Sequence, residues 1–180
     1  VDFLKIAPRL KTTTGYPADE TLGTFAGTLF FKHRWPGLTL KLQAVYGQNL
    51  HHLTMLGGYG VRGVTDEIRL NWGYAPLETL SFWAEAHTNG KTWQTGVFAG
   101  YCRNLGAPEP VPLAVYARAA DIASVYRVSP RLVHNAGKMR LAAEAELTAA
   151  AYGTPDASGK VLRAAYKANL RLLVAVYYFF

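Results

Sequence analysis

The feature that most constrains this chain is an alternation of apolar and polar residues at every second position. In the segments 38–47, 67–74 and 139–148, apolar side chains occupy one set of alternate positions and mostly polar side chains occupy the other. Because successive side chains of a β-strand point to opposite faces, this period predicts strands with one apolar face. A helical alternative exists for the Ala-rich stretch 139–151. A helix would, however, scatter Met139, Leu141 and Leu147 instead of aligning them in a stripe.

Extended along the chain, the alternation predicts ten strands, at residues 3–11, 22–33, 38–47, 53–62, 67–74, 79–88, 91–103, 122–134, 138–152 and 163–180. The links 35–37, 63–66, 89–90 and 135–137 are tight, the links 12–21, 47–52, 104–121 and 153–161 are longer, and the short link 75–78 is an exception to this alternation. In outer-membrane barrels, short turns lie on the periplasmic side and longer loops lie outside. The sequence therefore predicts an all-β fold, a transmembrane up-and-down antiparallel β-barrel made by a single domain of residues 1–180.

The composition argues against both a helical membrane protein and a disordered chain. Half of the 180 residues are apolar and 17% are charged. The longest apolar stretch, Leu172–Phe180, is far shorter than the run of about 18 residues that marks a transmembrane helix, whereas a tilted transmembrane strand needs only about 9 to 11. The segment Val1–Lys5 alternates like a strand and lacks the features of a secretory leader. We therefore expect that a signal was removed or that the chain starts partway through a longer protein.

The last predicted strand carries the most specific pattern. Counting back from the end, one face holds Phe180, Tyr178, Val176, Val174, Leu172 and Leu170. This pattern resembles the C-terminal signature of bacterial outer-membrane proteins, which the barrel-assembly machinery of that membrane recognises. The resemblance implies that Tyr178 and Phe180 belong to the assembly signal. The alternative is a buried last strand in a soluble sandwich, but an exposed aromatic strand in a soluble protein invites edge pairing and aggregation.

Four segments in about the last 60 residues resemble the closing strands of porin-like outer-membrane proteins of the DcaP-like type. They are Val128–Arg131, Asn135–Lys138, Ala149–Thr154 and Leu172–Phe180. The resemblance implies a larger barrel, usually trimeric, that passes small and often anionic solutes. Members of that group are longer than 180 residues, so the resemblance also implies that this chain is the C-terminal part of a bigger barrel.

Charged residues at the alternate positions predict what such a barrel would pass. If the apolar face meets lipid, the other face lines the interior, and its charge sets the selectivity. The predicted pore-lining residues are Lys5, Arg9, Lys11, Lys41, Arg69, Arg127, Arg131, Arg140, Lys167, Arg171, Glu85 and Glu144. Cations dominate this set, and the net charge of the chain is +7. We therefore expect an outer-membrane porin or diffusion channel for small, preferentially anionic solutes, in contact with outer-membrane lipid and lipopolysaccharide, without a cofactor or metal.

The residues also raise four alternatives to the channel. Cross-lumen ion pairs would make the barrel a plugged scaffold. A lipid-modifying enzyme would need a nucleophile, and Ser81 is conceivable beside Glu85 and His87, although Ser81 and Glu85 are about 13 Å apart along one strand. The adjacent His51 and His52 point to opposite sides of a strand and have no carboxylate cluster for a metal. Nucleic acid is not expected as a partner, because no recognition helix or RNA-binding aromatic motif accompanies the basic residues.

Overall fold

A computed structural model describes all of residues 1–180, and 71% of them lie in β-strands. The strands are antiparallel, and the only helix is a short 3₁₀ turn, η1 (Leu50–Leu53). The structure contains no helix of the length and apolar character needed to cross a membrane. The chain is therefore an all-β protein, as the alternation predicts. The stretch 139–151 lies in a strand, so its helical alternative is wrong.

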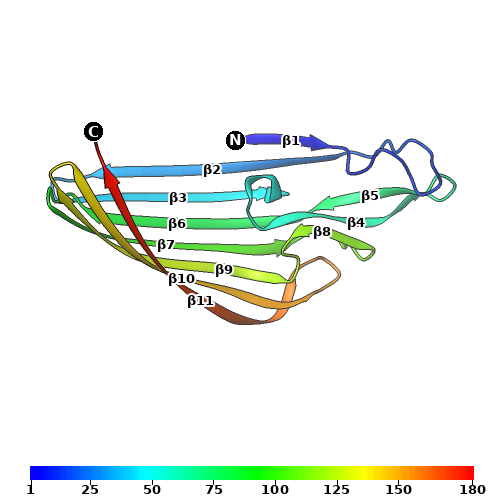
Figure 1. The fold of residues 1–180 in the computed structure, drawn as a ribbon. Helices are drawn as coiled ribbons and strands as arrows, with labels where there is room; N and C mark the ends of the chain where they lie inside the picture. The colour runs from blue at the N-terminus through cyan, green and yellow to red at the C-terminus, as the bar shows by residue number, and fades with distance from the viewer.

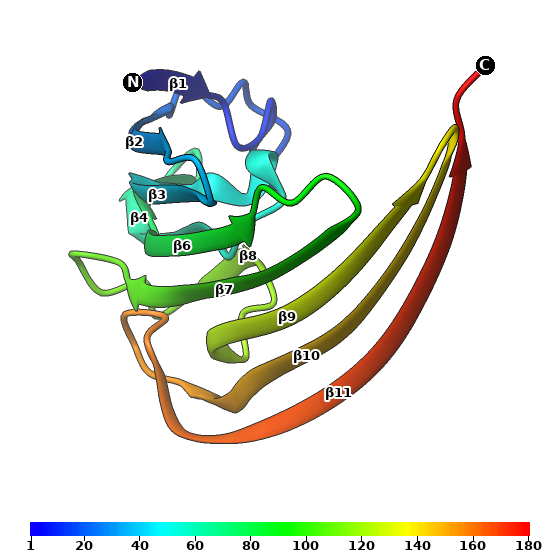
Figure 2. The ribbon, with the colours of Figure 1, turned by 90° about the vertical axis from the view of Figure 1, so that its left-hand side faces the viewer.

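The larger of two sheets contains eight strands (Figure 1). In spatial order these are β1 (Asp2–Ile6), β2 (Leu22–Arg34), β3 (Leu38–Gln48), β6 (Glu78–Thr88), β7 (Trp93–Gly106), β9 (Ile122–Ala136), β10 (Met139–Pro155) and β11 (Val161–Tyr178). The sheet curves strongly into an open trough, and β11 runs along its lower right edge in Figure 2. The terminal strands β1 and β11 do not pair, and the sheet is not closed into a barrel.

The smaller sheet contains β5 (Asn71–Pro76), β4 (Gly57–Asp66) and β8 (Ala114–Arg118), in that order. It lies at the end of the large sheet where the longer connections gather (Figure 1). Strands β4 and β5 belong to the connection between β3 and β6, and β8 belongs to the connection between β7 and β9.

The small sheet and its flanking loops have an ordinary buried core. Leu50, Val61 and Leu77 are completely inaccessible to solvent. Gly60 lets the loop residue Val111 lie directly against β4, because a Cβ at position 60 would come within 2.5 Å of the Cβ of Val111. This part of the molecule follows the packing rules of a water-soluble domain.

Most predicted strands match the structure closely in the large sheet, but the first, 3–11, is cut short because β1 ends at Ile6, and the prediction fails between residues 53 and 78. The predicted tight turn 63–66 lies within β4, and the turn falls at 67–70 because Asp66 Oδ1 accepts hydrogen bonds from the amides of Ile68 and Arg69, each at 2.9 Å. The predicted loop 104–121 contains β8, which the alternation missed. The large sheet thus has eight strands rather than ten.

This correction also removes the irregular short link at 75–78. Since β4 and β5 lie outside the large sheet, the whole segment from η1 to Leu77 is one long connection. The remaining tight links, at 35–37, 89–92 and 137–138, all join strands at the opposite end of the large sheet (Figure 1). Asn89 ties two of these turns together, because its amide donates a 2.8 Å hydrogen bond to the carbonyl of Trp35.

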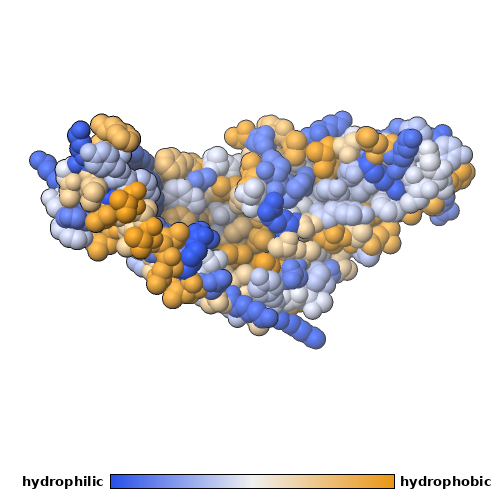
Figure 3. All heavy atoms as spheres, in the orientation of Figure 1, coloured by the Kyte–Doolittle hydropathy of each residue, from blue (hydrophilic) through white to orange (hydrophobic).

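One face of the large sheet, here called the convex face, is apolar and uncovered. Cross-strand partners share a face, and the residues on this face include Phe31, Leu42, Phe82, Val97, Val128, Leu132, Leu141, Leu147, Leu170, Leu172, Val174 and Val176. Leu172 is 75% exposed and Val174 is 81% exposed. Apolar side chains gather over the outer surface of β10 and β11 at the lower left of Figure 3. Exposure on this scale is unusual for a monomeric protein in water.

Aromatic side chains border the apolar band on the convex face. Tyr101, Tyr126 and Tyr166 lie near the end with the long connections, while Trp93 and His134 lie near the tight turns. Along β7, Tyr101 and Trp93 are about 26 Å apart at ~3.3 Å per residue. Two other aromatics, Trp72 and Tyr74, lie in the small sheet and not in this border.

Candidate functional site on the concave face

The opposite face of the large sheet, here called the concave face, lies on the inner side of the curve. Lys41 on β3 pairs with Glu85 on β6, which pairs with Phe98 on β7, and Phe98 pairs with Ser129 on β9. Side chains two positions away along each strand share this face. The curvature brings side chains of non-adjacent strands close enough to touch.

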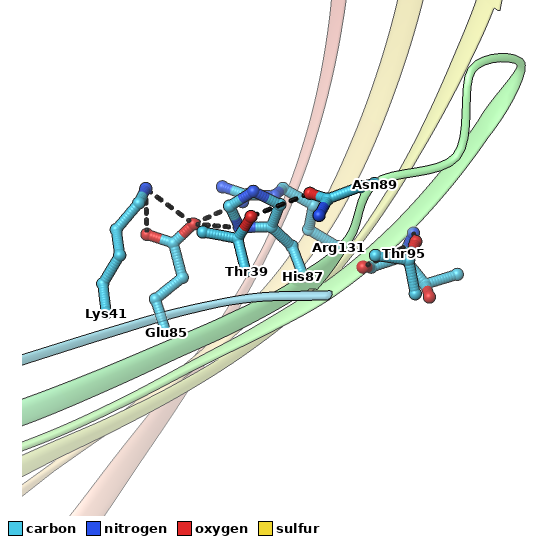
Figure 4. Close-up of polar contacts among 8 residues, drawn as sticks. Thr39, Lys41, Glu85, His87, Asn89, Thr95 and Arg131 are labelled. Carbon is cyan, nitrogen blue, oxygen red and sulfur yellow. Dashed lines mark hydrogen bonds and ion pairs between the residues drawn. The ribbon is translucent and has the colours of Figure 1, made fainter. Parts of the chain in front are cut away.

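Glu85 is the centre of a first cluster of charges (Figure 4). Lys41 Nζ lies 3.3 Å from each carboxylate oxygen, and Arg131 Nη2 donates to Oε1 at 2.6 Å. Arg131 reaches across β7 above Gly96, where a Cβ would lie 3.4 Å from its Nε. His87 Nδ1 lies 3.2 Å from the same Oε1. One carboxylate is thus held by two permanent cations from two other strands.

Glu146 is the centre of a second cluster, in which one carboxylate again contacts two permanent cations. Arg127 Nη1 lies 3.1 Å from Glu146 Oε2, and Arg171 Nη2 lies 3.3 Å from the same oxygen. Arg127 also donates from Nε to Thr148 Oγ1 at 2.9 Å. These contacts join β9, β10 and β11 across the concave face.

Each cluster has one more cation than it has carboxylates. Partly exposed ion pairs contribute only about 0–1 kcal/mol to stability, so the larger physical effect of these groups is the field that they produce. Lys32 and Lys167 lie on the same face and make no ion pair, which adds to the positive charge. A concave surface with an excess of cations raises the local concentration of anions.

Most of the predicted pore-lining residues share the concave face. They are Lys41, Glu85, Arg127, Arg131, Arg140, Glu144, Lys167 and Arg171. Five of these eight take part in the two clusters. Arg140 instead donates to Asn135 at 2.8 Å, and Lys167 lies over the ring of Tyr152. Glu144 makes no ion pair, because its cross-strand partner Arg131 turns toward Glu85.

Four predicted residues lie elsewhere, which corrects their expected positions. Lys5 pairs with Gly23 and shares the convex face with Phe3 and Phe25. Arg9, Lys11 and Arg69 lie in the connections beside the small sheet, because β1 ends at Ile6 and the turn after β4 extends to residue 70.

Arg9 packs against the small sheet and does not face the concave surface. Its guanidinium lies 4.0 Å from the centroid of the Trp72 ring and donates to the carbonyl of Leu70. These two contacts, a cation–π interaction and a hydrogen bond, attach the first long connection to the β4–β5 hairpin.

Three neighbouring aromatic residues on the concave face were not predicted from the sequence. Phe30 pairs with Gln43, which pairs with Trp83, and Phe98 pairs with Glu85, so all three rings share the face of the charges. The alternation itself could have placed Trp83 there, because Trp83 stands two positions before Glu85 and therefore lies on the same face of β6. It was missed because apolar side chains were assigned to the lipid face.

The residues considered for an enzyme or a metal are only partly brought together. His87 contacts Glu85, but the hydroxyl of Ser81 makes no hydrogen bond with either residue. His51 Nδ1 contacts Asn49 Oδ1 at 2.7 Å, and His52 contacts the Asn49 carbonyl and Asp2. No group of three or more His, Cys, Asp or Glu side chains has an arrangement that could hold a metal ion.

The predicted assembly signal lies at the tight-turn end. Tyr178 pairs with Met139 on the convex face, and Phe180 follows the end of β11 with its ring 5.5 Å from that of Tyr178. Both side chains are exposed. They extend the apolar surface of β11 to the end of the sheet.

Comparison of the chain with protein-family models, with curated proteins and with solved structures found no match.

Proposed function

We propose that the eight-stranded sheet is the wall of a transmembrane β-barrel in the outer membrane of a Gram-negative bacterium. The apolar convex face would meet lipid, and the concave face would line a channel for small, preferentially anionic solutes. The observation that carries this proposal is the opposite character of the two faces, with exposed Leu and Val on one and doubly paired glutamates on the other.

The free energy of burying apolar side chains favours lipid over water beside the convex face. Burial of one Leu or Val side chain contributes about 1.5–3 kcal/mol relative to exposure to water. An apolar band bordered by aromatics and about 25 Å tall is the exterior of outer-membrane barrels. The separation of about 26 Å between Tyr101 and Trp93 along β7 corresponds to a band roughly 19–22 Å tall if the strand is tilted by about 35–45°, slightly less than this height.

The free edges of the sheet require closure in such an environment. Strand β1 pairs only with Leu22–Ala26 of β2, so the backbone of Gly27–Arg34 has no partner on that side, and β11 has none on its outer side. Every unpaired backbone group in hydrocarbon costs several kcal/mol. We propose that further strands close the barrel, in keeping with the resemblance to DcaP-like porins, and that the assembled barrels form trimers.

The ion pairs favour an open channel over a plugged scaffold. All contacts of Glu85 and Glu146 are with the same strand, an adjacent strand or the next strand along the wall. They therefore fix side chains along the wall instead of joining opposite walls. A plugged barrel remains the alternative outcome of the test.

The test is a recording from the complete protein in planar lipid bilayers. We expect discrete conductance steps, and in a KCl gradient a reversal potential of the sign that marks preference for chloride. A folded barrel without current would support the plugged scaffold, and a cation-selective current would contradict the proposed role of the concave face. Recognition by the barrel-assembly machinery is tested separately, by deletion of Phe180 and measurement of insertion into outer membranes.

A further inference from the structure

The concave face carries an aromatic cluster beside its charges. The ring centroids of Phe30 and Trp83 are 6.2 Å apart, and those of Trp83 and Phe98 are 5.7 Å apart. The three residues come from β2, β6 and β7. Aromatic rings on the water-facing side of a channel wall are unfavourable unless a solute or a neighbouring group covers them.

A hollow of about 250 Å³ adjoins this cluster, and its lining includes Trp83, Phe98, Gly100, Cys102, Arg127 and Thr148. Gly100 makes the hollow possible, because a Cβ there would lie 3.0 Å from Cζ of Phe98 and 3.4 Å from Cβ of Trp83. Two rings therefore form one side of the hollow, and the guanidinium of Arg127 contributes to its lining.

Arg127 is positioned to bind an anion in the hollow. Its contacts with Thr148 and Glu146 use Nε and Nη1, while a guanidinium carries five N–H donors in a planar fork. The side chain is 45% exposed, so Nη2 and part of Nη1 are available to a solute. A carboxylate is the group that such a fork binds best.

From these positions we propose that the hollow is a subsite for monocarboxylates that carry a flat aromatic ring. The ring of the solute would lie against Trp83 and Phe98, and its carboxylate would bind Arg127. A simple anion such as chloride or acetate would use only the guanidinium. The proposal rests on the proposed function, because the concave face is taken as the surface that solutes meet.

The test is equilibrium dialysis of the folded protein in detergent micelles, with benzoate as the probe and acetate as the matched anion without a ring. We expect saturable benzoate binding in excess of that to empty micelles, and no saturable acetate binding over the same range. Trp83→Ala and Arg127→Gln should each weaken benzoate binding roughly fivefold, the size expected for one aromatic or charged contact.

Two further variants separate the subsite from a change in the fold. Phe31→Leu removes a ring from the convex face of β2, next to Phe30 in the sequence and outside the lining of the hollow, and should leave benzoate binding unchanged. Gly100→Ala should displace the ring of Phe98 and weaken binding about as much as Trp83→Ala. Far-ultraviolet circular dichroism of each variant confirms that the strands are retained.

The outcomes distinguish the subsite from the channel. If benzoate binds no better than acetate, or if Trp83→Ala and Phe31→Leu have equal effects, the subsite is wrong, whatever the bilayer recordings show. If benzoate binds as expected but the barrel carries no current, the subsite stands as a binding site and the channel fails.

Discussion

The two sheets of this protein obey different physical rules. The small sheet and its loops bury Leu50, Val61 and Leu77 completely, and glycines let the chain segments approach closely. The large sheet has no second layer over its apolar face, and Leu172 and Val174 are almost fully exposed. The first is built as a water-soluble domain is built, with its own core. The second leaves its apolar face uncovered, and the proposed lipid environment would supply the missing layer.

The largest expected effect comes from the core of the small sheet. Leu77→Ala should destabilise this sheet by about 2–5 kcal/mol, because it removes a fully buried side chain and leaves a cavity. Leu170→Ala, at an exposed position on the convex face, is the matched control and should cost far less in detergent. Native-state hydrogen exchange measures the loss of amide protection in each variant. Equal losses in the small sheet would contradict the difference proposed between the two sheets.

A charge on the convex face should have the next largest effect. Leu172→Arg should destabilise the protein in lipid vesicles by about 2–4 kcal/mol, the cost of a guanidinium near the bilayer midplane. Leu173→Arg is the control, because Leu173 pairs with Glu144 on the concave face. Equilibrium unfolding by urea from vesicles gives both values. Similar costs for the two substitutions would show that the faces do not differ in environment.

Substitutions at the Glu85 cluster should change selectivity in opposite directions. Lys41→Gln removes a cation and should lower the chloride-to-potassium permeability ratio, while Glu85→Gln removes the carboxylate and should raise it. One charge at about 8 Å in water contributes ~0.5 kcal/mol, which corresponds to roughly a twofold change in each direction. Reversal potentials in a KCl gradient measure the ratio. Shifts of the same sign would contradict the electrostatic role of the cluster.

The smallest effect concerns the loop between β10 and β11. The hydroxyl of Ser158 donates to Asp156 Oδ1 at 2.8 Å, and together with the Ser158 and Lys160 amides it holds the pKa of Asp156 below its usual value. The turn is therefore stabilised fully above the usual aspartate range and loses this contribution as the pH falls through the lowered folded-state pKa.

Ser158→Ala should raise the pKa of Asp156 toward its ordinary value of about 3.9. An NMR titration of the Asp156 side chain measures this change. An unchanged midpoint would show that the backbone amides alone set the pKa of this carboxyl group.

The period of two was sufficient to predict the faces of the large sheet because one face is uniformly apolar. It failed between residues 53 and 78, where the glycine-rich β4 and the hydrogen bonds of Asp66 determine the local structure instead. It also failed for Lys5, because pairing with Gly23 decides which face an edge residue joins, and no local pattern reveals a partner.

The candidate site was predictable in its charges but not in its contacts. Lys41, Glu85 and Arg131 stand at the alternate positions that form the polar face. Their ion pairs, however, depend on the open space at Gly96 and on the curvature of the sheet (Figures 2 and 4). The rings of Trp83 and Phe98 were not among the predicted pore-lining residues, whereas the strand register places them on the concave face.

The most direct measurement compares two adjacent residues of β11 in lipid. Leu172→Cys and Leu173→Cys, each combined with Cys102→Ser, would carry a fluorescent label in protein reconstituted into vesicles. Nitroxide lipids should quench the label at position 172, and water-soluble acrylamide should quench the label at position 173. If acrylamide quenches both labels equally and nitroxide lipids quench neither, the convex face does not lie in a membrane.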